Sequence, residues 1–446
     1  MKKTAIIILS LLCCGIAPAQ TTYTLEQILD SARQNNIAIR SGNRNIAVAA
    51  EQHKEAFTKF FPTISGNGAW FNTNRSIVST DVKPSEMIPA STAAALAQAL
   101  PAEALAALSN PISINMIKNG VIGGVAAVQP VFAGGRIVNS NRLAKVGEEA
   151  SRLQLRLSEN EVDKTAEQYY WQMASIEEKL KTVAAVEALL GDIHKDVDVA
   201  VRAGVAMRND LLQVQLRQNE IESQKLKLNN GLSLVRMLLA QYCGLRDTTF
   251  ALSYNMNAGS PLSMKQDHRQ ALAGTAEYQL LGKQVESAAL QKKLAVGENL
   301  PSLGVGAGYG YNNILDKSQT RAMVFATLSV PISDWWRGSH AIKRSKIEYQ
   351  KAVDEKEDKA ELLCIRMQNA WNNVEEAYKQ LGIAQRSIEQ SEENLRLNRD
   401  YYKAGITKMS DLLEAQTLYQ QSLDRRTDAF ADYQNSILAY KQSVGQ

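Results

Sequence analysis

The sequence has few of the residues that most often carry chemistry. Its 446 residues include four cysteines and four histidines, and no histidine stands at metal-ligand spacing from a cysteine or a second histidine. We therefore expect no metal, no cofactor and no catalytic group, so the chain is not expected to be an enzyme. A formal net charge of +4 gives no reason to expect nucleic acid as a partner, because that requires a clustered basic surface.

Long hydrophobic runs are also scarce. The apolar run at residues 5–12 is too short to span a bilayer as a helix. It follows a positively charged start and precedes an Ala-Pro-Ala triplet, so the pattern predicts a secretory signal peptide over residues 1–19. A lipoprotein leader that ends at Cys13 or Cys14 is the alternative. It is disfavoured because neither cysteine follows a small residue.

Only Cys243 and Cys364 remain once such a leader is removed, which excludes a disulfide framework. We expect them to be two buried thiols rather than a disulfide. No other segment approaches a run of about 18 apolar residues. The mature chain is therefore expected either to stay in water outside the cytoplasm or to enter a membrane through strands.

Proline is missing from two long stretches, residues 131–260 and 332–446. Because proline in a helix interior costs about 3 kcal/mol, both stretches can form long helices. Apolar residues recur in them in alternating steps of four and three, which is typical of helices that coil around neighbours. In the second stretch these residues are Leu363, Met367, Ala370, Val374, Ala377, Leu381, Ala384 and Ile388. On this pattern alone an ordinary coiled coil is the simpler interpretation.

Each stretch is interrupted once by a short turn around a glycine, Gly204 or Gly405. Glycine suits the left-handed residue that ends a helix, and polar residues that can cap the next helix follow it. The sequence therefore predicts two helical hairpins, at residues 136–243 and 338–443.

The two turns stand 201 positions apart, and Pro130 and Pro331 keep the same offset. A constant offset predicts two tandem copies of one unit. The expected organisation is a signal peptide at 1–19, a first repeat at 20–243, a connector at 244–266 and a second repeat at 267–446.

Short extended segments precede the hairpins. In residues 302–311, apolar side chains occupy one parity and serine or glycine the other, which predicts a strand. Residues 321–330 carry a similar stripe, and 63–72 and 121–129 are the corresponding segments of the first copy. Each is about as long as the 9–11 residues of a tilted transmembrane strand. Four strands cannot close a barrel alone, so several copies must share one, and three copies would supply twelve strands.

The first copy also carries an insert at residues 77–119, which is rich in alanine and leucine. We expect it to form short helices on the outside loop of the first strand pair. Its composition predicts no function.

Three motifs complete the pattern: Thr24–Leu29 reads TLEQIL, residues 402–405 read YKAG, and residues 411–416 read DLLEAQ. Together with the repeat and the leader, they resemble the TolC family of outer-membrane efflux proteins over almost the whole mature chain. The resemblance implies that both copies are outer-membrane efflux repeats. It implies a mainly α fold, with four strands per protomer in a shared 12-stranded trimeric β-barrel and a long periplasmic α-helical coiled-coil tube.

The resemblance also implies a function. The chain would be a homotrimeric channel in the outer membrane of a Gram-negative bacterium, with a large periplasmic part. It would be the passive exit duct of a tripartite efflux or type I secretion system. Its partners would be a periplasmic adaptor (membrane fusion protein), an inner-membrane transporter and the outer-membrane lipid.

Specific residues follow from the resemblance by position. Acidic rings at the closed end of such channels fall on Asp411 and Glu414, which share one helical face and would favour cations as a pore gate. The alternative is a pair of solvated acids at a helix start. Polar links that hold the tips shut fall on Asp210 with Tyr402 and on Asn209 with Thr407, where the best-known member has arginine in place of Thr407. The expected adaptor contacts are Gly204, Val205, Gly405 and Ile406.

A secreted periplasmic coiled-coil adaptor or structural protein is the alternative function. An adaptor needs one helical hairpin flanked by several small β domains. This sequence instead predicts two hairpins and only four strands.

Overall fold

The computed structural model describes residues 21–117, 119–314, 317–332 and 334–446, so the expected leader at 1–19 lies outside the described residues. The elements, in chain order, are β1 (Thr22–Tyr23), α2 (Leu25–Asn35), α3 (Ile37–Thr58), β2 (Thr63–Asn72), β3 (Val78–Val82), the 3-10 turn η1 (Pro84–Glu86), α4 (Ala90–Ala99), α5 (Ala102–Ser109), β4 (Ile112–Met116), β5 (Asn119–Ala133), α6 (Arg136–Arg202), α7 (Arg208–Cys243), β6 (Ala251–Leu252), η2 (Pro261–Met264), α8 (His268–Leu272), α9 (Ala276–Glu298), β7 (Ser302–Ile314), β8 (Lys317–Ser329), α10 (Asp334–Lys403) and α11 (Met409–Ser443).

The chain forms two compact units. Unit 1 comprises Met1–Glu51, Lys145–Ala288 and Tyr349–Gln446, and unit 2 comprises Gln52–Ala144 and Ala289–Glu348. Each expected repeat contributes segments to both units. The two repeats therefore do not correspond to two separately folded domains.

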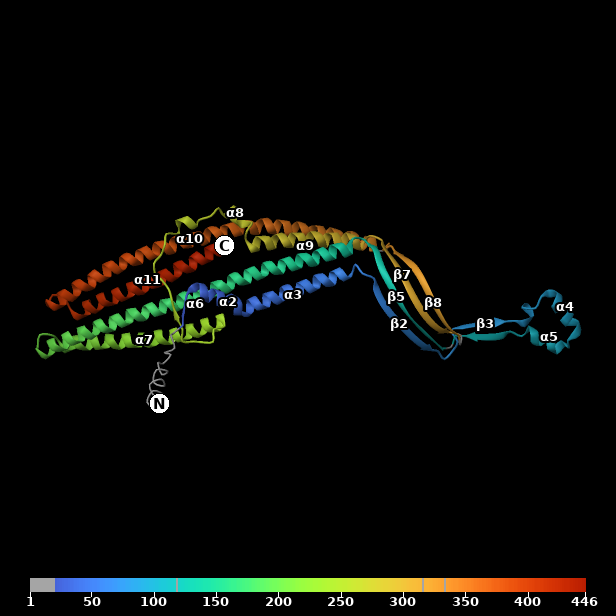
Figure 1. Ribbon diagram of the computed structural model, residues 1–446, viewed down its shortest axis with the longest axis horizontal. Helices are drawn as coiled ribbons and strands as arrows, with labels where there is room; N and C mark the ends of the chain where they lie inside the picture. The colour runs from blue at the N-terminus through green and yellow to red at the C-terminus, as the bar shows by residue number, and fades with distance from the viewer. Residues whose placement is uncertain (1–20, 118, 315–316, 333) are drawn as a thin grey trace, which may run out of the picture. The chain divides into compact units, whose positions relative to one another are not determined.

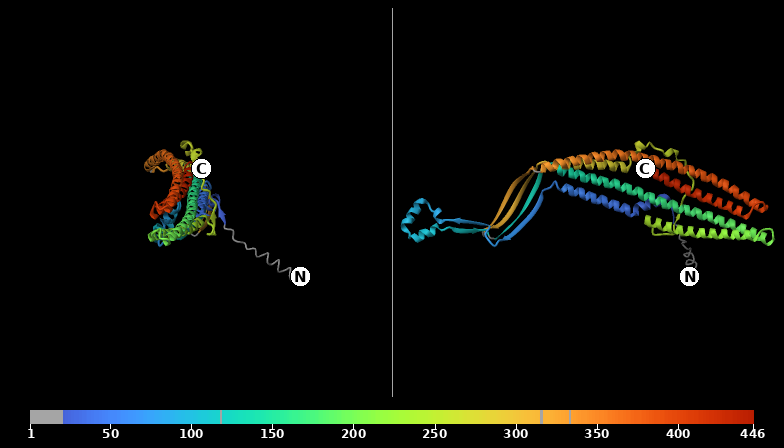
Figure 2. Two further views of the ribbon diagram at one scale, coloured as in Figure 1. Left: turned by 90° about the vertical axis from the view of Figure 1, so that its left-hand side faces the viewer. Right: turned by 180° about the vertical axis from the view of Figure 1, so that it is seen from behind.

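Unit 1 is built from the two helical hairpins, α6–α7 and α10–α11, whose tips lie at the same end (Figure 1). Seen end-on, these helices lie side by side in a curved layer (Figure 2). The hairpins share an apolar core in which the Trp171 ring of α6 packs edge-on against Phe430 of α11, with ring centroids 5.4 Å apart. The alternating three-and-four spacing places such residues on one stripe of each helix, and their burial joins the hairpins.

Helix α2 is fixed at both ends. At its start, the Thr24 hydroxyl accepts from the Gln27 N–H, and the Gln27 side chain accepts from the Thr24 N–H, which makes a capping box. Near its end, Arg33 holds the buried carboxylate of Asp163 on α6 through two hydrogen bonds of 2.9 and 2.6 Å. The planar guanidinium suits this paired geometry, so α2 is held in one position on the hairpin.

The two cysteines of the described chain are free thiols. Cys243, the last residue of α7, is buried, and burial raises the pKa of its thiol to about 12. Cys364 on α10 is half-buried. Among the described helices, none is both long enough and apolar enough to cross a membrane.

Unit 2 contains a four-stranded sheet in the order β2-β5-β7-β8, with every neighbouring pair antiparallel. Strands β5 and β7 come from different expected repeats, so the central pairing joins the two copies in one sheet. The strands β2 and β8 are its two edges. Among the described residues, each edge strand pairs on one side only.

Strand β5 extends past Pro130, where an extended segment would be expected to end. Proline cannot donate a hydrogen bond to a neighbouring strand and is tolerated at bulges and edges. The pairing of β5 with β7 shifts register between Pro130 and Phe132, and the pairing with β2 stops at Val128. Pro130 therefore lies where its missing N–H leaves no ladder bond unmade.

The insert between β2 and β5 contains more than short helices. Helices α4 and α5 are present, and the two strands of an antiparallel hairpin, β3 and β4, precede and follow them. The hairpin pairs Val78 with Met116 and Val82 with Ile112. Because the paired residues are 30 to 38 positions apart, the local sequence gave little sign of them.

Candidate functional site

The two hairpin tips have the same backbone. In the first, Gly204 has a φ of 73°, the Val205 N–H donates to the Ala200 carbonyl at 2.9 Å, and the Gly204 N–H donates to Val201 at 3.1 Å. This is a Schellman motif, in which a left-handed residue lets the chain satisfy the last carbonyls of a helix.

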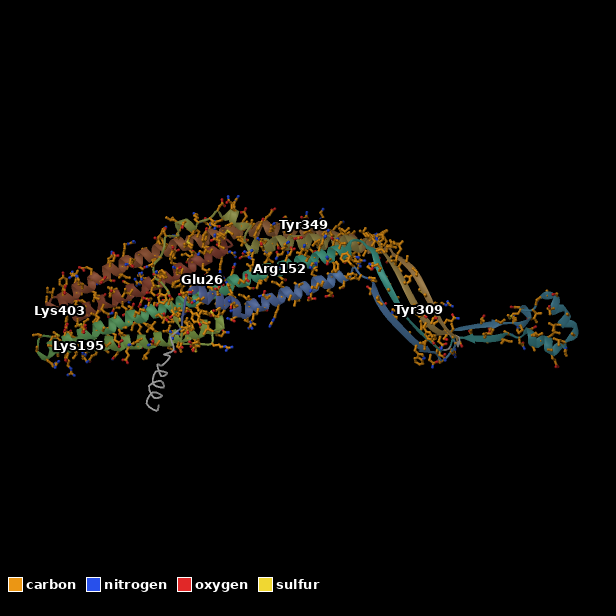
Figure 3. All side chains as sticks on the ribbon, viewed as in Figure 1. Glu26, Arg152, Lys195, Tyr309, Tyr349 and Lys403 are labelled. Atoms are coloured by element: carbon orange, nitrogen blue, oxygen red, sulfur yellow. The ribbon has the colours of Figure 1, made fainter. Side chains whose placement is uncertain are left out.

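The second tip repeats the motif 201 positions later. Gly405 has a φ of 70°, the Ile406 N–H donates to Tyr401 at 2.9 Å, and the Gly405 N–H donates to Tyr402 at 3.0 Å. The repeat seen in the sequence is thus reproduced bond by bond. Figure 3 labels Lys403, the last residue of α10, beside this tip.

An aspartate starts the second helix of each hairpin. Asp210 accepts from the Met207 N–H at 3.3 Å, and Asp411 accepts from the Lys408 N–H at 3.4 Å. Each carboxylate lies in the first turn, where it meets unpaired N–H groups and the positive end of the helix dipole. The turn at each tip is therefore stabilised by hydrogen bonds within its own hairpin.

The outermost side chains of the tips are apolar and exposed to solvent. Val205 is 80% exposed and Ile406 is 73% exposed. A β-carbon added at Gly204 or Gly405 would meet no atom within 4 Å. The expected adaptor-contact positions thus form two open, small, apolar knobs.

The expected gate residues Asp411 and Glu414 both lie at the start of α11, where Asp411 is exposed and Glu414 also lies in the first turns. The Asp411 carboxylate accepts hydrogen bonds from the hydroxyls of Thr407 at 2.7 Å and Ser410 at 3.1 Å. These bonds, that of Thr407 first, lower the pKa of Asp411, so the carboxylate stays ionised. In the single chain Asp411 both caps a helix and presents a fixed negative charge.

The residues of the two expected tip links all lie at or beside the hairpin tips. Tyr402 is half-buried, and its pKa is raised by burial and further by the negative charge of Asp210. Thr407 instead donates to Asp411 of its own hairpin, while Asn209 lies exposed at the start of α7. Within this chain the partner of Thr407 is Asp411, and the two expected tip links stay predictions.

A polar network farther along the hairpins was missed by the sequence interpretation. Arg217 on α7 donates from Nε to Gln416 Oε1 at 3.0 Å and from Nη2 to Gln420 Oε1 at 2.9 Å. Gln420 in turn donates to Gln224 on α7 at 2.8 Å. Both α11 glutamines are buried. The sequence does contain a signal for this network, which is a polar residue at a position where the helical spacing expects an apolar one. Arg217 lies three residues after the core residue Val214, and Gln224 lies three residues after the core residue Ile221.

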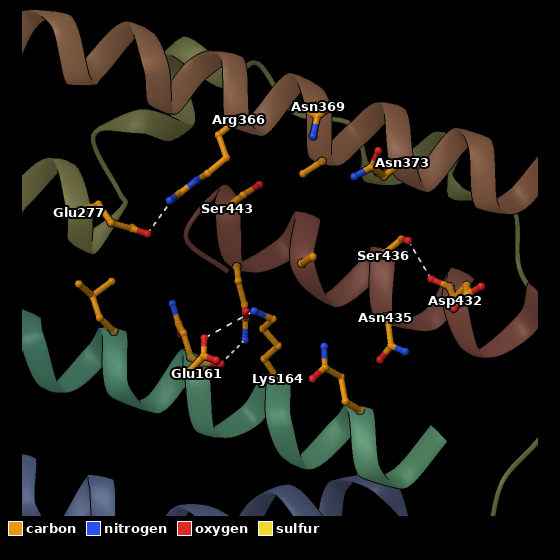
Figure 4. A pocket seen from close by; sticks show the side chains of 16 residues that line it. Glu161, Lys164, Glu277, Arg366, Asn369, Asn373, Asp432, Asn435, Ser436 and Ser443 are labelled. Carbon is orange, nitrogen blue, oxygen red and sulfur yellow. Dashed lines mark hydrogen bonds and ion pairs between the residues drawn. The ribbon is translucent and has the colours of Figure 1, made fainter. Parts of the chain in front are cut away.

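A groove of about 790 Å³ lies between α6, α10 and α11, near the end of α11 (Figure 4). Arg366 pairs with Glu277 across one end at 2.7 Å, and Lys164 pairs with Glu161 on the floor at 3.6 Å. Its lining is dominated by amides and charges rather than by apolar groups, unlike a typical small-molecule pocket. The groove is therefore suited to water and polar solutes. Among the described residues, no group of three or more His, Cys, Asp or Glu side chains could hold a metal ion.

One face of the sheet in unit 2 is apolar across all four strands. Cross-strand partners share a face, and the register places Trp70 opposite Val121, and Ala307 between Ala127 and Val324. Trp70 is 70% exposed and Val324 is 87% exposed. Tyr309 lies on the same face and is also exposed (Figure 3). The opposite face carries the glycines of β7, polar residues such as Asn67 and Arg321, and apolar residues such as Ile122 and Met323.

Comparisons with known proteins agree with this architecture. Residues 269–446 match the family model described as "Outer membrane efflux protein". VceC from Vibrio cholerae is 13% identical with a TM-score of 0.72, and the match covers 94% of this chain and 96% of VceC. CusC is 14% identical with a TM-score of 0.77, over 96% of this chain and 93% of CusC. The MtrE outer membrane channel of Neisseria gonorrhoeae is 15% identical with a TM-score of 0.70, over 94% and 88%. No curated protein sequence matches the chain significantly.

The open four-stranded sheet, the paired helical hairpins and these structural matches define the fold of a TolC-like outer-membrane channel protomer. The match to the outer membrane efflux protein family model covers residues 269–446, which is less than half of the chain. Members of this class are transport conduits of the outer membrane and not enzymes.

Proposed function

We propose that three copies of this chain join their sheets edge to edge into one closed 12-stranded barrel. The observation that carries the proposal is the open sheet of unit 2, which has one exposed apolar face and two edge strands. Unpaired edges are not tolerated in lipid, and an apolar outer face is what lipid requires. Because the four strands alternate in direction, β8 of one copy can pair antiparallel with β2 of the next, and alternation continues around the ring.

The barrel would continue into a periplasmic tube made of the helical hairpins. In this role the chain is the passive exit duct of a tripartite efflux or type I secretion system. An inner-membrane transporter supplies the cargo, and a periplasmic adaptor contacts the knobs at Gly204, Val205, Gly405 and Ile406. The exposure of Val205 and Ile406 supports such a contact, since apolar knobs can insert between helices of a partner.

The pore gate in this proposal consists of Asp411 and Glu414. Both carboxylates lie at the start of α11, and Asp411 is held ionised by its hydroxyl partners. Six such groups in a trimer would attract cations to the narrow end. The tandem division into 20–243 and 267–446 is part of the same proposal, supported by the two equivalent tips.

Fractionation and planar-bilayer recording test the proposed function. We expect the protein in the outer-membrane fraction, as a trimer that dissociates only on heating in detergent, and as discrete conductance steps after reconstitution. A monomer that stays in the soluble periplasmic fraction without detergent would reject the channel and favour the adaptor alternative.

A further inference from the structure

The Arg217 network is a distinctive polar link between the two hairpins of unit 1. Arg217 follows the tip glycine Gly204 by 13 residues, and Gln416 follows Gly405 by 11. At about 1.5 Å per residue, the network lies roughly 15–20 Å from the tips. It is therefore close to the proposed gate without being part of either tip.

The network uses the whole guanidinium of Arg217. Nε and Nη2 donate to the two glutamines of α11, and Nη1 donates to Glu220 at 2.8 Å. The Arg217 side chain is only 17% exposed, so its charge is balanced by Glu220 at the surface and by amide oxygens inside. A planar fork with fixed donors accepts few arrangements of its partners, unlike a flexible ammonium group.

Near the tips this network is the polar link that can select the register of α11 against α7, while farther along α11 Asp428 pairs with Lys179 and Ser175 of α6. Around it, the helices pack through apolar residues, including Val214 and Ile221 of α7 and Leu412 and Ala415 of α11. Apolar coiled-coil packing can be repeated after a shift along the helix, whereas a buried polar residue at a seam position selects one register. A shift of α11 against α7 would break both bonds from Arg217 and leave the buried amides with only the long 3.5 Å bond between Gln416 and Gln420.

We propose that Arg217 is a positioning residue of the gate: it fixes α11 against α7 and so sets where Asp411 and Glu414 stand relative to the tip of the first hairpin. This rests on the proposed channel function. Gln416 and Gln420 are the acceptors on α11, and Gln224 orients Gln420 from the α7 side.

Arg217→Met tests the proposal, with Arg236→Met as the matched control. Arg236 is also on α7 and is 22% exposed, but it pairs with Glu177 of α6, within its own hairpin. Spin labels at Val205→Cys and Ile406→Cys, in a Cys243→Ala and Cys364→Ser background, report the distance between the tips. Labelled chains are diluted into unlabelled ones, so that only the distance within one chain is measured.

We expect Arg217→Met to lengthen and broaden the tip distance and to raise the single-channel conductance severalfold, while Arg236→Met changes neither. Arg217→Lys should restore the distance only in part, because an ammonium cannot serve both glutamines in the same plane. A distance and conductance equal to those of the wild type in Arg217→Met, or the same change in Arg236→Met, would overturn the proposal.

A triple variant, Arg217→Met with Gln416→Leu and Gln420→Leu, separates positioning from stability. It removes the buried amides that a single substitution would leave unpaired, so the thermal midpoint should recover towards the wild-type value. The tip distance should stay altered if the network sets position, whereas full recovery of the distance would contradict that role. If the wild-type protein forms no channel, the proposed function fails. The distance between the spin-labelled tips still tests whether Arg217 fixes α11 against α7.

Discussion

The Thr407 hydroxyl donates a 2.7 Å hydrogen bond to Asp411 Oδ2 across the turn that connects α10 to α11. This bond places the carboxylate of Asp411 at the helix start and keeps it charged. A single side chain thus combines a local structural role with the charge expected of a gate, and the two roles can be separated by substitution.

Asp411→Asn combined with Glu414→Gln should lower the cation selectivity of the reconstituted channel. The two substitutions remove the negative charges, while the amide introduced by Asp411→Asn keeps an oxygen that can accept from the turn. Asp411→Ala should in addition destabilise the start of α11, because the carboxylate no longer accepts from the Lys408 N–H and the Thr407 hydroxyl. The reversal potential in a salt gradient measures selectivity, and an unchanged reversal potential in the amide variant would reject the gate assignment.

Asp424 on α11 should make unfolding depend on pH. Burial, together with the charge of Asp428 and against the opposing charge of Lys179, raises its pKa to about 6. An acid whose pKa is raised in the folded state stabilises the fold below its ordinary pKa, near 4, and this stability is lost as pH rises through about 6. Asp424→Asn should therefore raise the thermal midpoint at pH 7–8 and flatten its decline between roughly pH 4 and 7, with a gain of about 1 kcal/mol after solvent screening.

Asp428→Asn is the control for that experiment. Asp428 lies one turn away on the same helix, but it forms an ion pair with Lys179 at 2.6 Å. Its removal should lower the midpoint at pH 7 rather than raise it. If both amide variants shift the midpoint in the same direction, burial is not what governs Asp424.

Gly405→Ala should destabilise the second tip, although space for a methyl group is open there. The cause is the left-handed backbone of Gly405, which costs a residue with a β-carbon about 1 kcal/mol. Gly191→Ala, inside α6 and equally free of neighbours, should instead stabilise by up to about 1 kcal/mol through helix propensity. Opposite signs in thermal denaturation are expected, and equal signs would contradict the backbone explanation.

Gly124→Ala should impair assembly. A β-carbon at Gly124 would lie 2.9 Å from the backbone oxygen of Tyr309, so β5 and β7 could no longer pair as closely. At Gly68 the nearest atom would be 3.8 Å away, so Gly68→Ala should be tolerated. The yield of heat-dissociable trimer measures the effect, and equal yields from the two variants would rule out close approach as the reason for the glycine.

Much of this fold could be predicted because its strongest signals are local and repeated. The absence of proline and the alternating three-and-four spacing indicate α6 and α10 directly. The two-residue period of β7 placed Leu303, Val305 and Tyr309 on one face, where the structure has them. The strand count indicates that several copies share one barrel, and the resemblance to a family adds the number three and the tube, which both stay proposals for this chain.

Features that depend on distant pairing were not predictable. The order β2-β5-β7-β8 joins strands that lie far apart in the chain, and the short strands β3 and β4 are too brief for a clear period. The bond from Thr407 to Asp411 depends on the side-chain geometry of one turn. The Arg217 network needs helices from both hairpins brought together before its acceptors are defined.

Met207 and Lys408 occupy the same place in the two tips, since each donates its N–H to the aspartate three residues later. One offers a neutral thioether and the other an ammonium group on closely matching backbones. In a ring of three chains these ends would alternate around the axis, six in number but of two kinds. A partner that contacts both kinds of tip would need two different binding surfaces, one for the Met207 tip and one for the Lys408 tip. It could then bind at three equivalent positions around the ring rather than six.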